Sequence, residues 1–187
     1  MSKLLILDLD GTLVDVYHNS IDVKTTLDPI PIEGNNRLYK RPGLDAFLLQ
    51  CSELFTLAVW SAAGKDYVKA VVEAIFAPLG IELAFVWSSA RCIHKWNHFN
   101  NELTTIKPLR KVWRRRRWHR SNTLIVDDTP KTYCQNYRNA IRIVTWSCSD
   151  GTDTELERVL DILLYKRDRP VRIDNPRIRK SEFLRNI

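Results

Sequence analysis

With 187 residues, 44% of them hydrophobic and 27% charged, the chain has the size and composition of one globular α/β domain and is short for two. Its net charge of +7 indicates an anionic partner, such as a phosphorylated protein, a nucleic acid or an acidic protein. Four cysteines without CxxC spacing argue against a disulfide framework, and no apolar run is long enough to span a membrane. Aspartates stand early in the chain, where a signal peptide would stay apolar, so we expect an intracellular protein, cytoplasmic or nuclear.

The first predicted element is a strand over residues 3–8. Its apolar residues do not alternate with polar ones, which is typical of a strand that is buried on both faces of a parallel sheet. The strand ends in Asp8, Asp10 follows two residues later, and Gly11 allows a sharp turn. Ligands of such sheets bind outside the carboxyl ends of the strands, so this pair of aspartates is predicted at the mouth of a site.

Residues 14–40 show no sustained helical periodicity and contain two prolines, a glycine and two adjacent asparagines. We predict a hairpin or loop here, with a turn at Gly34-Asn35. A plain surface insertion is the alternative, and the length of the segment does not decide between the two.

Beyond residue 40 the pattern predicts helices and strands in alternation, from apolar stripes at helical spacing and short apolar runs. The predicted helices begin after Arg41-Pro42-Gly43, cover 65–76, begin at Lys107-Pro108 and cover 153–164, and the predicted strands cover 55–60, 83–87, 123–126 and 141–144. Residues 88–105 receive no assignment. The alternation predicts an α/β fold with a doubly wound, Rossmann-like parallel sheet of about five strands. The domain is expected over 1–165, with an extended or disordered basic tail over 166–187.

The strand over 123–126 ends like the first one, in the acidic pair Asp127-Asp128. If the two strands lie side by side, three or four carboxylates converge, and that much negative charge needs a cation. Hard oxygen ligands suit Mg²⁺. A single acidic residue after a strand is ordinary turn chemistry, but two runs of the same form favour a metal site.

Four segments of the chain carry a resemblance to a known family. They are DLDGTLV (8–14), KRPGLDAFL (40–48) with LAVWSAA (57–63), IKPLRKVW (106–113) and LIVDDTP (124–130). DLDGTLV resembles motif I of the haloacid dehalogenase superfamily of aspartate-nucleophile phosphatases. The whole set, over about 3–164, resembles its branch that dephosphorylates the C-terminal domain (CTD) of RNA polymerase II, also called the NLI-interacting-factor family. IKPLxxVW is most similar to the member that bears a ubiquitin-like domain, although we expect no such domain in this chain.

The resemblance implies a phosphatase with an aspartyl-phosphate intermediate, and it implies roles for the acidic residues. Asp8 would be the nucleophile, and Asp10 would protonate the leaving group and then activate water. Mg²⁺ would bind the carboxylate of Asp8, the backbone carbonyl of Asp10 and the carboxylate of Asp128. Asp127 would orient a ligating water or Lys107.

The same resemblance implies that other residues bind the phosphoryl group. Lys107 would neutralise its charge, Ser61 would bond one of its oxygens, and Thr12 and Arg41 would add contacts. It also implies a small flap over 14–40 and no large cap domain. Read without the family, Ser61 is a turn residue, Lys107 faces solvent, and Thr12 caps a helix or turn.

The run Arg110–Arg120 holds seven Lys and Arg residues and no acid. A solvated helix face, or a nuclear localisation signal, would explain it, but continuous like charge favours a phosphorylated or nucleic-acid partner. A zinc cluster could be drawn from four scattered residues, but their spacing fits no zinc pattern. They are Cys92, His94, His98 and His119.

Three functions are compatible with these residues. The favoured one is a Mg²⁺-dependent phosphoserine or phosphothreonine protein phosphatase of the CTD type. The alternatives are a phosphatase for nucleic-acid ends that carry a 3′-phosphate, and a non-catalytic phosphate-binding module. A site without a large cap suits a macromolecular substrate, but this does not separate a peptide from a DNA end.

Overall fold

The computed structural model describes residues 2–97, 101–115, 117–169 and 171. Most of the basic tail predicted over 166–187 therefore lies outside the described residues, as does His98. Within the described part of the chain, no helix is both long and apolar enough to cross a membrane.

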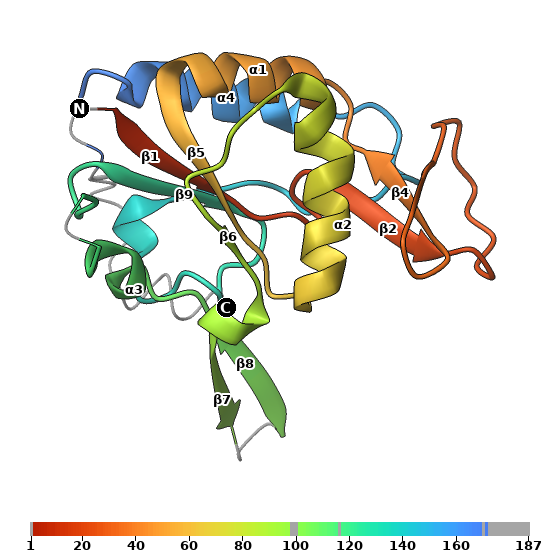
Figure 1. Ribbon diagram of the computed structural model, residues 1–187, viewed down its shortest axis with the longest axis horizontal. Coiled ribbons are helices and arrows are strands. Elements are labelled where there is room, and N and C mark those ends of the chain that lie inside the picture. The colour runs from red at the N-terminus through yellow and green to blue at the C-terminus, as the bar shows by residue number, and fades with distance from the viewer. Residues whose placement is uncertain (1, 98–100, 116, 170, 172–187) are drawn as a thin grey trace.

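A five-stranded sheet forms the centre of the fold (Figure 1). Its strands, in spatial order, are β10 (Ala140–Arg142), β9 (Thr123–Asp127), β1 (Lys3–Leu7), β5 (Phe55–Trp60) and β6 (Val86–Trp87), and every pair is parallel. The predicted α/β fold with a parallel sheet of about five strands is confirmed. Leu7 lies opposite Val59 on one side and Val126 on the other, so the carboxyl ends of three central strands meet at one edge.

Successive side chains of the central strands alternate between two buried faces. One face packs against α1 (Leu44–Leu54), α2 (Lys65–Phe76) and α4 (Glu155–Lys166), and α1 and α4 lie side by side (Figure 1). The other face packs against α3 (Arg110–Trp113) and the loops around it, and it buries Trp60, Trp87 and Trp118. Three short 3₁₀ helices complete the described elements, namely η1 (Ala77–Leu79), η2 (Ser89–Arg91) and η3 (Tyr137–Asn139).

The segment after β1 forms a small antiparallel sheet of its own, which we call the flap. It consists of β2 (Val14–His18), β4 (Asn36–Lys40) and β3 (Ile30–Ile32), in that spatial order. The turn occurs where the sequence predicts it, since Gly34 has φ 80° and Asn35 has φ 58°. Val16, Ile30 and Ile32 pack against the main core, so the flap is joined to the domain and is more than a surface loop.

Four elements differ from the prediction, and one of them is the last strand, which was expected over 141–144 and covers Ala140–Arg142. Residues 88–105, left unassigned, contain most of a second hairpin, β7 (Ile93–Asn97) and β8 (Glu102–Ile106), which projects from the core (Figure 1). The third predicted strand is shorter than expected, at two residues. The helix after Lys107 has only four residues, and the chain that follows it places Trp118 in the core with 4% exposure.

Candidate active site

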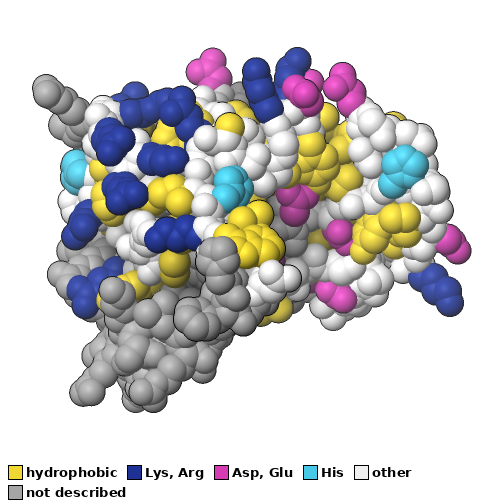
Figure 2. Space-filling model, turned by 90° about the horizontal axis from the view of Figure 1, so that it is seen from below, with side chains coloured by type: hydrophobic (Ala, Val, Ile, Leu, Met, Phe, Trp, Pro, Cys, Tyr) yellow, Lys and Arg dark blue, Asp and Glu magenta, His cyan; other side chains and the backbone are white. Residues whose placement is uncertain are grey.

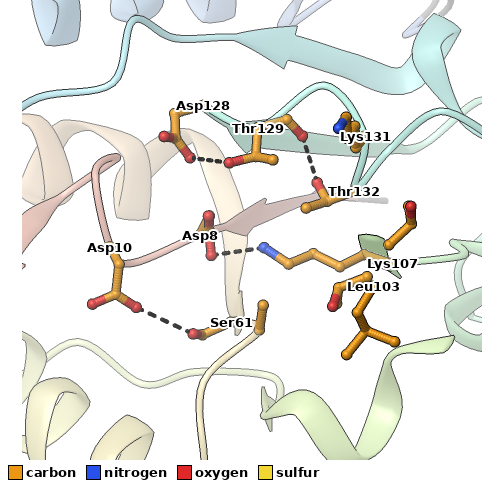
Figure 3. A pocket seen from close by; sticks show the side chains of 12 residues that line it. Asp8, Asp10, Ser61, Leu103, Lys107, Asp128, Thr129, Lys131 and Thr132 are labelled. Carbon is orange, nitrogen blue, oxygen red and sulfur yellow. Dashed lines mark hydrogen bonds and ion pairs between the residues drawn. The ribbon is translucent and has the colours of Figure 1, made fainter. Parts of the chain in front are cut away.

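Functional side chains from four strands meet at the carboxyl edge of the sheet, around a cavity of about 290 Å³ (Figure 3). Asp8 follows β1, Ser61 follows β5, and Asp128 follows β9, as expected from parallel strands that end at one edge. Lys107 follows β8 and reaches the same point from the projecting hairpin. The cavity is lined by Asp8, Asp10, Ser61, Lys107 and Asp128, by Leu103, Thr104 and Thr105 of β8, and by Ala62, Thr129, Lys131 and Thr132.

Lys107 is the buried centre of the site. Its Nζ lies 2.7 Å from Asp8 Oδ1 and 2.7 Å from Asp127 Oδ2. Burial alone would lower the pKa of Lys107, but the charges of Asp127 and Asp8 outweigh it and raise the pKa above its ordinary value. The lysine therefore carries its charge inside the fold, which explains why a cation precedes a helix here.

Asp127 is fully buried, and its carboxylate contacts Lys107 and does not line the cavity. Besides Lys107, its carboxylate accepts hydrogen bonds from Thr132 Oγ1 at 2.7 Å and from the backbone N–H of Thr129 at 2.9 Å. Of the two alternatives given by the sequence, orienting a water or orienting Lys107, the geometry supports the second.

Asp8 presents one oxygen to Lys107, and its other oxygen is on the side of Asp128 (Figure 3). Burial raises the pKa of Asp8, the ammonium of Lys107 opposes that rise, and the charges of Asp127 and Asp128 add to it. Additional positive charge beside Asp8 would therefore favour its ionised form.

Asp10 stands apart from this buried group. Its side chain is exposed, points toward Ser61, and lies 3.5 Å from the Ser61 hydroxyl (Figure 3). The hydroxyl of Tyr67, from the first turn of α2, donates a hydrogen bond to its other oxygen. Asp10 is thus held at the mouth of the cavity, where it can exchange protons with a bound molecule.

Asp128 is held by hydroxyls and by a close backbone contact. Thr145 Oγ1 donates to one carboxylate oxygen at 2.7 Å, and Thr129 Oγ1 donates to the other at 3.1 Å. Gly11 has φ 71°, and a Cβ there would lie 2.8 Å from Asp128 Oδ2. Only glycine fits this conformation without strain, so the turn after β1 and the acid after β9 are fixed together.

The acidic residues fit a hard metal ion. Asp8, Asp127 and Asp128 each offer an oxygen, and these atoms lie within 4.8 Å of one another. Oxygen ligands of this kind match the preference of Mg²⁺. Within the described residues this is the only group of three or more such ligands, so Cys92, His94 and His119 form no zinc cluster there.

We expect Asp128→Ala to weaken Mg²⁺ binding by at least about tenfold, roughly 1.4 kcal/mol, because it removes a carboxylate that faces the cavity. Asp127→Ala should weaken binding less, since the Asp127 carboxylate is fully buried against Lys107 and does not line the cavity. Calorimetric titration of Mg²⁺ into both folded variants measures the difference. A larger loss in the Asp127 variant would reverse the assignment of the ligand.

Two residues that were predicted to contact substrate do not line the cavity in the structure. Thr12 is fully buried, does not line the cavity, and its hydroxyl accepts a hydrogen bond from the backbone N–H of Asp128 at 3.2 Å. Arg41 is 1% exposed, and its guanidinium donates to both oxygens of Asp153 and to the carbonyls of Gly11, Thr12 and Val144. Both residues fix the turn after β1, and neither faces the cavity.

Removing the guanidinium should destabilise the fold strongly. Arg41→Met is expected to lower the free energy of unfolding by about 3–5 kcal/mol, because it takes the cationic partner from Asp153 and a donor from the carbonyls of Thr12 and Val144. Arg158→Met is the matched control, since Arg158 also pairs with a carboxylate but is 44% exposed, and its loss should cost about 0–1 kcal/mol. Urea unfolding of the two variants tests this, and equal losses would contradict the role given to Arg41.

Several residues of the site carry no clear signal in the sequence. Tyr67 lies on a helix, and only the fold brings it to Asp10. Leu103 lies on the hairpin that sequence patterns left unassigned. Thr129 and Thr132 could have been found, because they follow the second acidic pair directly and hydroxyls near carboxylates are natural donors.

Comparison with solved structures agrees with this fold. The fission yeast RNA polymerase II CTD phosphatase Fcp1, bound to beryllium fluoride, superposes with a TM-score of 0.55 at 22% identity, over 91% of this chain and 53% of that one. At this identity the likeness concerns the fold alone.

Comparison with known sequences identifies the family. CTD small phosphatase-like protein 1 of Caenorhabditis elegans is 30% identical over 86% of this chain, and the human CTD small phosphatase-like protein is 29% identical over 87%. The chain spans only 30% of the first relative and 54% of the second. The family model described as NLI interacting factor-like phosphatase matches residues 3–169, and the chain therefore belongs to the NLI interacting factor-like phosphatase family.

Proposed function

We propose that this chain is a Mg²⁺-dependent protein phosphatase of the CTD type, which removes phosphate from phosphoserine or phosphothreonine. The observation that carries the proposal is the placement of Lys107 between Asp8 and Asp127, 2.7 Å from each, beside a cavity that Asp10 also lines. A nucleophile, a proton donor and a buried cation are the parts that phosphoryl transfer needs. The names of the relatives as CTD small phosphatases support the same activity.

The reaction has two steps. In the first, an oxygen of Asp8 attacks phosphorus, the bond from phosphorus to the seryl or threonyl oxygen breaks, and Asp10 gives that oxygen a proton. In the second, water attacks the phosphorus of phospho-Asp8 while Asp10 takes a proton from it, and the bond to Asp8 breaks. Phosphate leaves, and both aspartates return to their initial state.

Positive charge in the site lowers the barrier of both steps. Lys107 is fixed by its two carboxylates, so it needs no rearrangement when charge builds up on the phosphoryl oxygens. The hydroxyl of Ser61 can donate to one of these oxygens, as the resemblance implies. Asp8, Asp128 and the backbone carbonyl of Asp10 would hold Mg²⁺, which supplies further positive charge beside the phosphoryl group.

An open site favours a phosphoresidue on a macromolecule over a small metabolite. The flap and the hairpin are both short, so a polypeptide can approach the cavity from outside. The partner that we propose is a phosphorylated protein. Two relatives are named for the nuclear envelope, which supports a location inside the cell.

The test is a panel of substrates with and without Mg²⁺. A phosphoserine peptide, a phosphothreonine peptide and a 3′-phosphorylated oligonucleotide are compared by kcat/KM, with an aryl phosphate as reference. We expect Mg²⁺-dependent turnover, lost in EDTA, with a phosphopeptide as the best macromolecular substrate. Preference for the oligonucleotide would favour a nucleic-acid-end phosphatase, and phosphate binding without turnover would favour a non-catalytic module.

A further inference from the structure

A strongly basic surface lies beside the site, and the phosphatase chemistry does not use it. Residues 88–126 contain ten Lys and Arg and one acid, Glu102. Six exposed arginines of this stretch belong to η2, to α3 and to the chain that follows α3, and we call them the arginine face. They are Arg91, Arg110, Arg114, Arg115, Arg117 and Arg120. Dark blue side chains gather on one side of the view in Figure 2, with apolar ones between them.

Among the residues that the structure describes, no carboxylate balances the charge of the arginine face. None of its six guanidinium groups forms an ion pair with a carboxylate among the described residues. The neighbouring Lys111 uses its ammonium within the fold, since it donates to the carbonyls of Arg91 at 2.7 Å and Cys92 at 3.3 Å. A concentration of unpaired like charge attracts an anionic partner.

Aromatic rings contact four of the six arginines, namely Arg91, Arg115, Arg117 and Arg120. Arg91 and Arg115 lie over the ring of Trp87, at 5.3 Å and 5.1 Å from its centroid, and Arg117 lies 4.8 Å from the centroid of Trp118. Guanidinium groups fixed in this way lose little freedom when they bind, and their planar forks suit phosphate.

The same rings help to decide which kind of anion fits. Trp87 and Trp118 are 6% and 4% exposed and lie beneath the arginines, so they are not available as aromatic anchors for a protein partner. A face that is cationic and polar, with arginine as its main residue, matches an interface with nucleic acid.

One aromatic side chain nearby is available for stacking. Trp96 is 50% exposed on β7, opposite Leu103 on β8. The hairpin is joined to the arginine face, because Lys111 of α3 donates to the carbonyl of Cys92, directly before β7. Exposed aromatic rings beside a basic surface are the usual platform for the bases of a single strand. The four residues of α3 are too few for a helix that reads a duplex groove.

We propose that the arginine face and Trp96 together bind single-stranded nucleic acid, with the arginines on phosphates and Trp96 on a base. This binding goes beyond the proposed phosphatase function and does not require turnover. Because Leu103, the neighbour of Trp96, lines the catalytic cavity, a bound strand would run past the mouth of the site.

The test is fluorescence anisotropy of a labelled oligothymidylate without a terminal phosphate, titrated with protein in EDTA at several salt concentrations. The triple variant Arg114→Ser, Arg115→Ser, Arg117→Ser removes three charges from the face. The control Lys24→Ser, Lys65→Ser, Lys69→Ser removes three exposed charges from the flap side and α2, with the same change in net charge. We expect the arginine variant to bind at least about tenfold more weakly than the wild type. The slope of log affinity against log salt concentration should fall by about two in this variant, because each phosphate contact on a single strand contributes about 0.7 to that slope.

Trp96→Ala should weaken binding by about tenfold without changing the salt slope, since stacking involves no ion release. All variants should hydrolyse an aryl phosphate like the wild type, which shows that they are folded. The proposal is overturned if the wild type shows no saturable binding, or if the lysine control loses as much affinity as the arginine variant. Polyglutamate competing as well as the oligonucleotide would also overturn it, in favour of an acidic protein. If the wild type itself binds the oligonucleotide but does not hydrolyse the aryl phosphate, the result counts against the proposed function alone.

Discussion

Asp8→Asn is expected to abolish hydrolysis of an aryl phosphate while the protein stays folded. Asparagine has nearly the same shape, but its amide is a far poorer nucleophile than a carboxylate, so no phosphoenzyme can form. Lys107 keeps its ion pair with Asp127, and the amide oxygen of residue 8 can accept a hydrogen bond from it.

The stability of this variant follows from the pKa of Asp8. Burial raises that pKa, which means that the folded state disfavours the charged carboxylate, and a neutral amide removes this cost. The amide also takes one of its two carboxylate partners from buried Lys107, so the two effects oppose each other and the thermal midpoint should stay close to the wild-type value at neutral pH. Asp161→Asn, an exposed site on α4, is the matched control for the chemical change and should keep full activity. Wild-type kcat in the Asp8 variant would remove this residue from the mechanism.

The bounds of helices and strands could be predicted from the sequence where the patterns were strong and local. The strand over 55–60 and the helix over 65–76 have the predicted bounds, because an unbroken apolar run and a clear helical stripe leave few alternatives. The meeting of Asp8 with Asp127 was also predictable. It needed only two acidic strand ends and the rule that parallel strands end at one edge.

The direction in which a side chain points was harder to predict than the position of its residue near the site. The motif placed Arg41 near the site, but its guanidinium turns inward to Asp153, which lies 112 residues away in sequence. Thr12 likewise faces the backbone of Asp128 instead of the cavity. Such contacts depend on which distant segment packs against the turn, and no local spacing encodes this.

The hairpin of β7 and β8 was missed for a different reason. Trp96 and Leu103 pair across it and are both about half exposed, so its apolar side chains do not mark a face buried in the core. Periodicity reports burial, and an element that projects into solvent gives little of that signal. This is also the element that brings Leu103 and Lys107 to the cavity.

Asp10→Asn is expected to lower turnover by about 10²–10⁴-fold, the usual contribution of a general acid or base. Asn can still accept the hydrogen bond from Tyr67, so the side chain should stay in place at the mouth of the cavity. The loss should be larger for an alkyl phosphate than for a nitrophenyl phosphate, because only the alkoxide needs a proton in order to leave. A substitution that merely loosened the site would reduce the turnover of both substrates by the same factor.

The second step gives this variant a further signature. Without a base to take the proton from water, phospho-Asp8 should persist, and with the nitrophenyl substrate the variant should release one equivalent of nitrophenol in a burst and then slow down. Intact-mass spectrometry after an acid quench should find one added phosphoryl group, absent in Asp8→Asn treated in the same way. If leaving-group dependence is unchanged and no adduct is found in any quench, then Asp10 does not move the proton. The exposed position beside Ser61 would then only bind the substrate.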